Sequence, residues 1–211
     1  MRRLPTAGAL GAIHLLAAGA TGCERDMVPA ICPAAGAGGL VITEIRGNQS
    51  GTTSDTLGQW IELYNASGGD LDLEGLTLDL RRHDGSDQGL VRVRRALPVA
   101  AGAYVVLGRF DDATRPAYVD YGWAPDLLTS SGQLRDIVSA GAIDADACEQ
   151  QVDRVVFEAL PAAGTYALGV SPPDADANDA AAAWCTDATD DSDPITRGLP
   201  GSPGEANPPC P

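Results

Sequence analysis

From Gly39 onward, the chain is a succession of short β-rich runs separated by turn residues such as Asp84-Gly85. The clearest runs alternate apolar and polar side chains with a period of two, which predicts half-buried strands. No run sustains a helical period, and residues 179–184 could form one helical turn at most. The expected strands are 40–45, 59–64, 76–80, 90–94, 104–107, 152–157 and 166–168, with weaker candidates at 117–121 and 134–138.

Strands of this length and spacing predict an all-β fold, and more narrowly an immunoglobulin-like β-sandwich. In the second run, Ile61 and Leu63 should face the core while Trp60 and Glu62 face the other way. Single all-β domains commonly reach this size, so we expect one domain over residues 39–211.

The first 22 residues have the layout of a secretory signal peptide. Arg2 and Arg3 precede an uncharged, largely apolar stretch that ends in small residues. That order of a basic head, an apolar middle and a small-residue cleavage site is typical of export signals. Proline and glycine interrupt the apolar stretch, so a permanent membrane span is the less favoured interpretation. We therefore expect a cleaved signal at 1–22 and a flexible tether at 23–38.

The four residues Ala20-Thr21-Gly22-Cys23 resemble a bacterial lipobox. In such a motif a lipid joins the cysteine thiol, and cleavage makes that cysteine the new N-terminus. Ala20 departs from the motif, which usually has leucine three residues before the cysteine. The alternative is ordinary cleavage nearby, with Cys23 left free to form a disulfide. We expect lipidation of Cys23, and hence an exported, membrane-anchored protein in the periplasm or at the cell surface.

Cysteine counting favours the same interpretation, because five cysteines are an odd number for an exported chain. Setting Cys23 aside leaves an even set that suits disulfides in an oxidising compartment. Four cysteines allow three pairings, and counting does not choose among them. No CxxC pair or Cys/His cluster indicates zinc. The even set is Cys32, Cys148, Cys185 and Cys210.

The charge of the chain bears on its partners. Loss of Arg2 and Arg3 with the signal would change the formal net charge from −15 to −17. An acidic surface repels phosphate backbones, so no nucleic-acid partner is expected. The expected partners are the membrane, through the N-terminal lipid, and an unidentified envelope or extracellular macromolecule.

Few residues suggest catalysis. Outside the signal the only histidine is His83, which lies beside Asp84 in a polar run that is typical of a hairpin tip rather than a catalytic triad. Glu44 and Glu62 fall on strands expected to be neighbours, so a glycosidase-type acid/base pair is one interpretation. Such a pair needs a defined separation and a sugar-sized cleft between the two carboxylates, and this interpretation is the less favoured one.

One acidic loop resembles a calcium site. Asp174, Asp176 and Asn178 present oxygen atoms at alternate positions. An EF-hand loop would then need glycine at its sixth position and glutamate at its twelfth, where this chain has Asp179 and Cys185. A solvated loop is therefore favoured over a weak Ca²⁺ site, and no cofactor is firmly implied.

Three tryptophans are candidates for sugar binding, and two N-glycosylation sequons are candidates for modification. Trp60, Trp123 and Trp184 could stack on a sugar, but large aromatics in a sandwich are more often core anchors. Trp123 is the best candidate for exposure. The sequons at Asn48 and Asn65 would matter only in a eukaryotic secretory pathway.

Six segments, taken in order, resemble the lamin tail domain family. Residue Leu76 stands where the family usually has tryptophan, and residues 111–151 depart from its pattern. The matching segments are 41–45 (VITEI), 59–65 (QWIELYN), 71–78 (LDLEGLTL), 97–107 (LPVAAGAYVVL), 152–157 (VDRVVF) and 199–208 (LPGSPGEANP).

This resemblance implies an immunoglobulin-like sandwich used for binding or as a structural appendage, with no catalytic residues. It also implies a structural role for Glu44 and Glu62 as acceptors of backbone or side-chain hydrogen bonds near a strand end, and this role is the favoured interpretation of the two glutamates. Exported bacterial members often carry a tryptophan–cysteine pair like Trp184-Cys185 and a terminal cysteine like Cys210. The resemblance therefore implies a Cys185–Cys210 disulfide, and we prefer Cys32 with Cys148 as the second pair.

The expected function is that of a non-catalytic envelope lipoprotein whose domain binds a macromolecule or has a structural role. Two alternatives stay open: an accessory or weak hydrolase acting on envelope polymers, and a calcium-dependent adhesion module.

Overall fold

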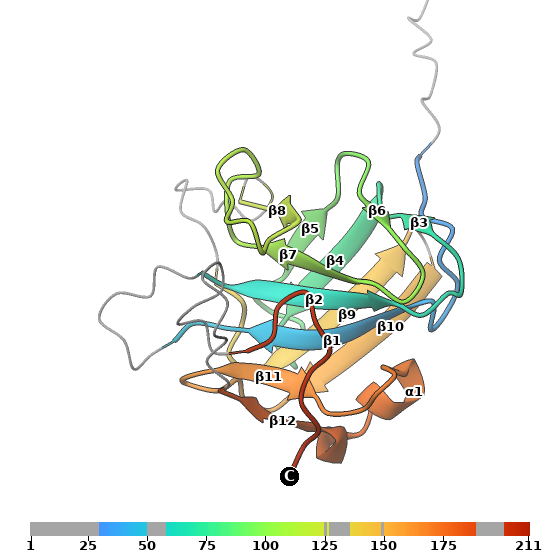
Figure 1. Ribbon diagram of the computed structural model, residues 1–211. Helices are drawn as coiled ribbons and strands as arrows, with labels where there is room; N and C mark the ends of the chain where they lie inside the picture. Colours follow the sequence, from blue (N-terminus) through green and yellow to red (C-terminus); the bar gives the residue numbers. More distant parts are fainter. Residues whose placement is uncertain (1–29, 50–57, 125, 127–135, 149, 189–200) are drawn as a thin grey trace, which may run out of the picture.

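Two β-sheets pack face to face in this protein (Figure 1). The larger sheet has six strands in the order β12-β11-β1-β2-β7-β8, antiparallel except for the β7–β8 pair. Its strands are β1 (Leu40–Arg46), β2 (Trp60–Asn65), β7 (Tyr104–Gly108), β8 (Tyr121–Gly122), β11 (Thr165–Leu168) and β12 (Trp184–Asp187). The computed structural model describes residues 30–49, 58–124, 126, 136–148, 150–188 and 201–211.

The smaller sheet has four antiparallel strands in the order β10-β9-β4-β5. These are β4 (Leu76–Arg81), β5 (Gly89–Arg92), β9 (Gly141–Ala147) and β10 (Gln150–Phe157). A short ribbon pairs β3 (Leu71–Asp72) with β6 (Pro98–Val99), and helix α1 (Ala175–Asn178) lies between β11 and β12 with a 3₁₀ turn at Ala181–Ala183. The expected all-β, immunoglobulin-like sandwich is confirmed.

The core lies between the sheets and follows the predicted alternation. Leu76 and Leu78 on β4 are completely buried, and Ile61 and Leu63 on β2 face them from the larger sheet within the same apolar cluster. Each fully buried side chain of this size contributes about 1.5–3 kcal/mol to folding. Trp60, from the opposite face of β2, belongs to a separate small cluster.

One major strand was not predicted. β9 lies between β10 and β4 at the centre of the smaller sheet, with Ile143 completely buried. The expectation of a strand at 134–138 is wrong for the described residues 136–138, which form none. The segment 117–121 supplies only the first residue of β8.

The N-terminal part of the described chain packs on the sandwich. Ala35 is buried, and the Gly38 N–H donates to the Val152 carbonyl at 2.7 Å. Cys32 bonds to Cys148, which follows β9 directly. The segment expected as a tether, 23–38, therefore includes a docked part from Ala30 onward; residues 23–29 lie outside the described residues.

Two disulfides join the expected cysteines. Cys32 pairs with Cys148 and Cys185 with Cys210, with Cα atoms 5.5 Å and 5.7 Å apart. This confirms the pairing drawn from the family resemblance and indicates an oxidising compartment. The signal peptide and Cys23 lie outside the described residues. Within the part of the chain that is described, no helix is long and apolar enough to cross a membrane.

Candidate functional site

The most unusual polar feature of the sandwich is a pair of buried glutamates in the larger sheet. Glu44 on β1 and Glu62 on β2 are cross-strand partners, at a bulge where the β1 register shifts after Ile42. Neither residue is exposed to solvent at all. They occupy the face of the sheet opposite the main core, since Ile61 and Leu63 on either side of Glu62 point inward.

Glu44 accepts its hydrogen bonds on one oxygen. The Thr165 hydroxyl of β11 donates to Glu44 Oε1, and the Ser202 backbone N–H donates to the same atom at 3.2 Å. Glu44 Oε2 is buried and has no hydrogen-bond partner among the described residues. A buried carboxylate oxygen without a donor is costly when charged, so a proton is favoured on this group.

Glu62 accepts on both oxygens. The Thr43 hydroxyl donates to Oε1 at 2.7 Å, and the Gly204 backbone N–H donates to Oε2 at 2.6 Å. The two glutamates thus accept from their own sheet on one side and from residues near the C-terminus on the other.

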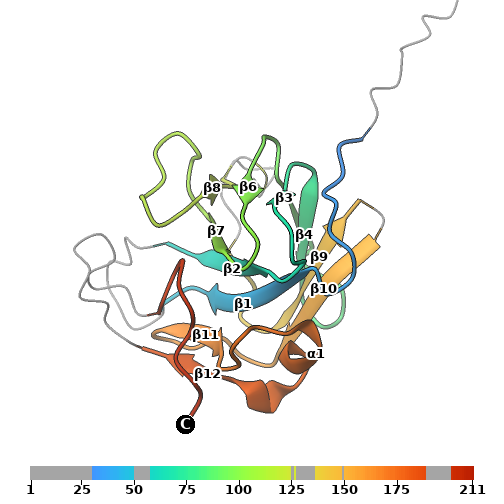
Figure 2. The same cartoon turned by 45° about the vertical axis from the view of Figure 1, so that its right-hand side comes forward.

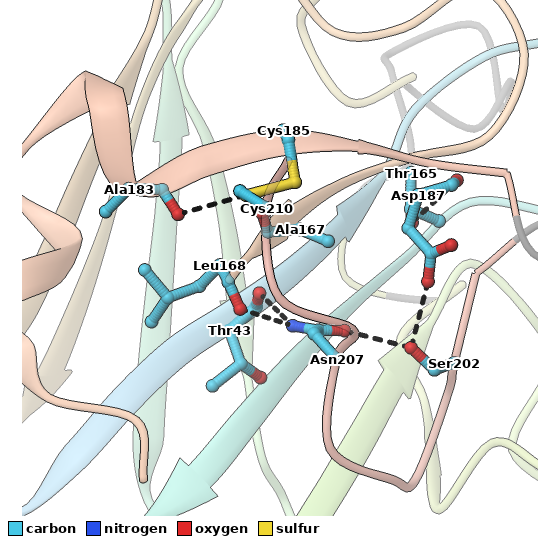
Figure 3. Close-up of a disulfide and its surroundings, with 10 residues drawn as sticks. All are labelled: Thr43, Thr165, Ala167, Leu168, Ala183, Cys185, Asp187, Ser202, Asn207 and Cys210. Atoms are coloured by element: carbon cyan, nitrogen blue, oxygen red, sulfur yellow. Dashed lines mark hydrogen bonds between the residues drawn. A yellow bond between two sulfur atoms is a disulfide. The ribbon is translucent and has the colours of Figure 1, made fainter. Parts of the chain in front are cut away.

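The donors Ser202 and Gly204 belong to the segment 201–211, which we call the strap. Figures 1 and 2 show the strap crossing the outer face of the larger sheet, over β1, β11 and β12. The Asn207 side-chain amide donates to the Thr43 carbonyl at 2.8 Å and to the Leu168 carbonyl at 3.3 Å (Figure 3).

Two further contacts fix the ends of the strap (Figure 3). Near its start, the Ser202 hydroxyl lies 3.0 Å from Asp187 Oδ2 and 3.1 Å from Asn207 Oδ1. Near its end, Cys210 bonds to Cys185 of β12. The strap is therefore joined to the sheet both covalently and through the glutamate pair.

Burial changes the acidity of the pair. The pKa of Glu44 is raised from 4.5 to about 8, because desolvation and, to a smaller extent, the nearby Asp187 carboxylate outweigh the opposing hydrogen bonds from Thr165 and Ser202. The pKa of Glu62 is raised well above its usual value, first by desolvation and then by the charge of Glu44. At neutral pH the site therefore holds protons that solvated glutamates would have lost.

The pair does not have the geometry of a glycosidase. Such enzymes place two carboxyl groups across a cleft that admits a sugar and a water. Glu44 and Glu62 are sealed under the strap, so no substrate reaches them in this conformation. An open hollow of about 530 Å³, lined by residues 48, 82, 87 and 136–139, includes neither of them. The structural interpretation fits both glutamates better than the catalytic one.

His83 lies where the hairpin prediction placed it, in the connection between β4 and β5. Its side chain is 42% exposed, and Nε2 lies 3.8 Å from Glu158 Oε2. Ser86 and Asp84 bond to each other in the same turn and not to the imidazole. These contacts do not form a catalytic triad.

The calcium candidates have structural partners. Asp174 caps α1 by accepting from the Ala177 N–H at 2.9 Å. Asn178 is buried and donates to the Ile42 carbonyl at 3.2 Å and to Asp153 at 2.8 Å, while Asp176 is exposed. Over the ranges that the structure describes, no three acidic, histidine or cysteine side chains gather as metal ligands. Calcium binding therefore stays the less favoured alternative to a solvated loop.

The tryptophans are anchors. Trp60 and Trp123 are completely buried and Trp184 is 7% exposed, so the expectation that Trp123 would be exposed is wrong. Trp184 stacks on Tyr166 with ring centroids 4.7 Å apart. Asn65, of the second sequon, is also buried, and its amide donates to three backbone carbonyls.

Comparison with known proteins gives one match. The model of the family described as Lamin Tail Domain matches residues 33–156, more than half of the chain. No curated protein matches the chain. The matched range ends within β10 of the smaller sheet. Beyond it, β11 and β12 extend the larger sheet past β1, and the strap completes the polar site on that sheet.

Proposed function

This chain belongs to the lamin tail domain family, and from that premise we propose that it is a non-catalytic envelope lipoprotein, held to a membrane through Cys23. The family suggests an immunoglobulin-like domain that binds or supports other molecules rather than one that catalyses a reaction. The sealed glutamate pair agrees with that view, because three of its four carboxyl oxygens already accept hydrogen bonds from the protein itself.

The observation that carries the proposal is the complete pairing of four of the five cysteines. Both disulfides indicate an oxidising compartment, which requires export. They also leave Cys23 as the one cysteine without a partner in this chain. A lipid on that thiol accounts for the odd cysteine and for the small residues that precede it.

The positions of Ala30 and of the strap support one orientation of the anchored domain relative to the membrane. The described chain begins near β3, while the C-terminus lies at the opposite end of the sandwich (Figures 1 and 2). Six residues separate Cys23 from Ala30, so the seven steps between their Cα atoms span at most about 25 Å when extended. The β3 end would therefore lie near the membrane, and the strap would face away from it toward a macromolecular partner.

Intact-mass measurement on the membrane fraction of the native host tests the anchor. The proposal expects a mature chain that begins at Cys23 and carries lipid. A Cys23→Ser variant should lose both the lipid and the membrane association. A Cys32→Ser variant, which changes a cysteine of the folded domain, should keep both. A soluble, unlipidated chain that begins at another residue would contradict the proposal.

A cross-linking and capture experiment tests whether the domain binds a macromolecular partner. We expect the Cys23-anchored protein, cross-linked in its native membrane, to retain an envelope macromolecule that the Cys23→Ser variant retains less well. Retention that is equal for both variants would show that the anchor does not bring the domain to its partner.

A further inference from the structure

We propose that the strap and the Glu44–Glu62 pair form a latch, locked by the Cys185–Cys210 disulfide and coupled to protonation of the pair. While the disulfide is intact, the strap stays closed. Once the disulfide is opened, the strap leaves the sheet as the pair ionises, and the outer face over β1 and β11 is uncovered.

The strap is held by few non-covalent groups. It forms no strand pairing with the sheet, and its one backbone–backbone bond among the described residues is internal, from the Glu205 N–H to the Ser202 carbonyl at 3.1 Å. Its prolines donate no backbone hydrogen bond. Docking therefore depends on the Ser202 and Gly204 N–H groups, the Ser202 hydroxyl and the Asn207 amide. The four prolines are Pro203, Pro208, Pro209 and Pro211.

The disulfide lies within reach of a reductant. Cys185 and Cys210 are both partly exposed. A dithiol can attack one sulfur, release the other as a thiol, and then close its own disulfide. The protein gains two thiols and the dithiol becomes oxidised, so the exchange balances. After it, only the non-covalent contacts hold the strap.

Ionisation of the two glutamates opposes docking of the strap. Both are excluded from water only while the strap covers them, and an undocked strap would let them be solvated and ionise. The titratable groups that act on the pair from packed elements are Asp187 of β12 on Glu44, and Asp120 and Tyr104 around Glu62. Arg46, on the same strand as Glu44, donates to the Gly58 carbonyl. Asp187 raises the pKa of Glu44 and Asp120 raises that of Glu62, so both carboxylates oppose a second negative charge on the pair.

The direction of the coupling follows from the shift. With the strap docked, the pKa of Glu44 is raised from 4.5 to about 8, chiefly by burial, so docking is strongest where the pair is protonated. With one coupled proton, the docking equilibrium of an open strap falls by up to roughly tenfold for each pH unit above the pKa that Glu44 has with the strap undocked, as far as about pH 8.

Hydrogen exchange at the Ser202 and Gly204 amides tests the latch, because these two N–H groups bond to the glutamates. Protection factors, corrected for the intrinsic pH dependence of exchange, are measured at pH 6 and pH 8 on the full chain. The open variant carries Cys185→Ser and Cys210→Ser; the matched control carries Cys32→Ser and Cys148→Ser. Amides of β9 serve as an internal reference for global folding.

The latch predicts that protection of both strap amides in the open variant falls more than tenfold from pH 6 to pH 8. In the control variant it should stay within about twofold, since its strap is still covalently closed. Adding Glu44→Gln and Glu62→Gln to the open variant should remove the pH dependence, because neither amide can ionise. Equal protection at both pH values in the open variant, or a pH dependence that survives the double substitution, would overturn the proposal.

If the open variant does not fold, which the β9 amides would reveal, the oxidised wild-type chain provides a second readout. The ¹⁵N shift of the Ser202 amide should titrate with a midpoint near that of Glu44, and this titration should vanish in Glu44→Gln. A Ser202 shift that is flat across this range in the wild type, or unchanged by the substitution, also overturns the latch. Neither experiment involves Cys23, so failure of the latch leaves the lipid anchor unaffected.

Discussion

Glu44 and Glu62 are cross-strand partners on β1 and β2, and both carboxyl groups are completely buried beneath residues that lie more than 130 positions away in the chain. Like charges directly opposite each other on a sheet are destabilising. The arrangement is consistent with stability only if the pair shares at least one proton, and this condition leads to the first prediction.

The first prediction concerns stability against pH. Because the pKa of Glu44 is raised from 4.5 to about 8 on folding, the folded state holds more protons than the unfolded state between those values. Its stabilising contribution is complete below the unfolded pKa and is lost as pH rises toward the folded one. The free energy of unfolding should therefore fall by up to about 1.4 kcal/mol per pH unit in this window. Denaturant titrations between pH 4.5 and pH 8 measure it.

Glu44→Gln should flatten that dependence, because a neutral amide replaces the titrating group. The matched control is Glu205→Gln on the strap, where the carboxylate is exposed and the slope should stay as in the wild type. A Glu44→Gln chain that keeps the full pH slope would show that another group is responsible.

Gly201→Ala should loosen the strap. A Cβ at Gly201 would lie 2.6 Å from Glu44 Oε1 and 2.7 Å from Thr165 Cγ2, and the residue has φ +109°. Gly204→Ala is the control, because Gly204 also has a positive φ, +87°, but its Cβ would meet nothing within 4 Å. Both variants bear a backbone cost of about 1–2 kcal/mol. Only Gly201→Ala should lose further stability through a steric clash, measured as a lower midpoint of thermal unfolding than that of Gly204→Ala. Equal midpoints for the two variants would contradict a close contact between Gly201 and the sheet.

Asn207→Ala should cost about 1–3 kcal/mol, because it leaves the Thr43 and Leu168 carbonyls without the amide that joins them. Glu205→Ala, on the exposed side of the same strap, should stay within about 0.5 kcal/mol of the wild type. Denaturant unfolding of both variants at one pH gives the comparison. A loss for Glu205→Ala as large as that for Asn207→Ala would remove the special role of the amide.

The two disulfides should differ in their contribution. Their cysteines are 25 and 116 residues apart. In the chain-entropy model these loops correspond to about 3.5 and about 5 kcal/mol of stability. Replacing Cys32 and Cys148 by serine should therefore lower the unfolding midpoint more than replacing Cys185 and Cys210. The reverse order would mean that the strap stabilises the sheet by more than restriction of the unfolded chain.

The sandwich could be predicted where strands alternate large apolar and polar side chains. Ile61 and Leu63 on β2 and the leucines of β4 carry a strong period-two signal, and both strands lie where it predicts. β9 was not predicted as a strand, because its buried positions include alanines, as at Ala145 and Ala147, and its other face holds Asp144 and Asp146. Alanine and aspartate are depleted in strands, and the pairing that stabilises β9 comes from neighbours distant in the sequence.

The polar site could be predicted only in part. Glu44 and Glu62 were recognisable as carboxylates on neighbouring strands, and their structural role was the favoured interpretation. Their burial depends on Ser202 and Gly204, whose contribution is a backbone N–H that any residue except proline carries. Such donors leave no signal in the identity of a side chain. Asn207 lies in the closing motif, and it binds the sheet through its side-chain amide, which, unlike a backbone N–H, is specific to the residue type.

The most direct test of the account is a ¹³C NMR titration of the Glu44 and Glu62 carboxyl carbons in the oxidised chain, with Glu205 as the exposed internal reference. We predict that Glu44 titrates with a midpoint near pH 8 and that Glu62 ionises well above the usual range of a glutamate. If both buried glutamates titrate near the ordinary glutamate value of 4.5, the strap does not close over a protonated pair, and the central claim is contradicted.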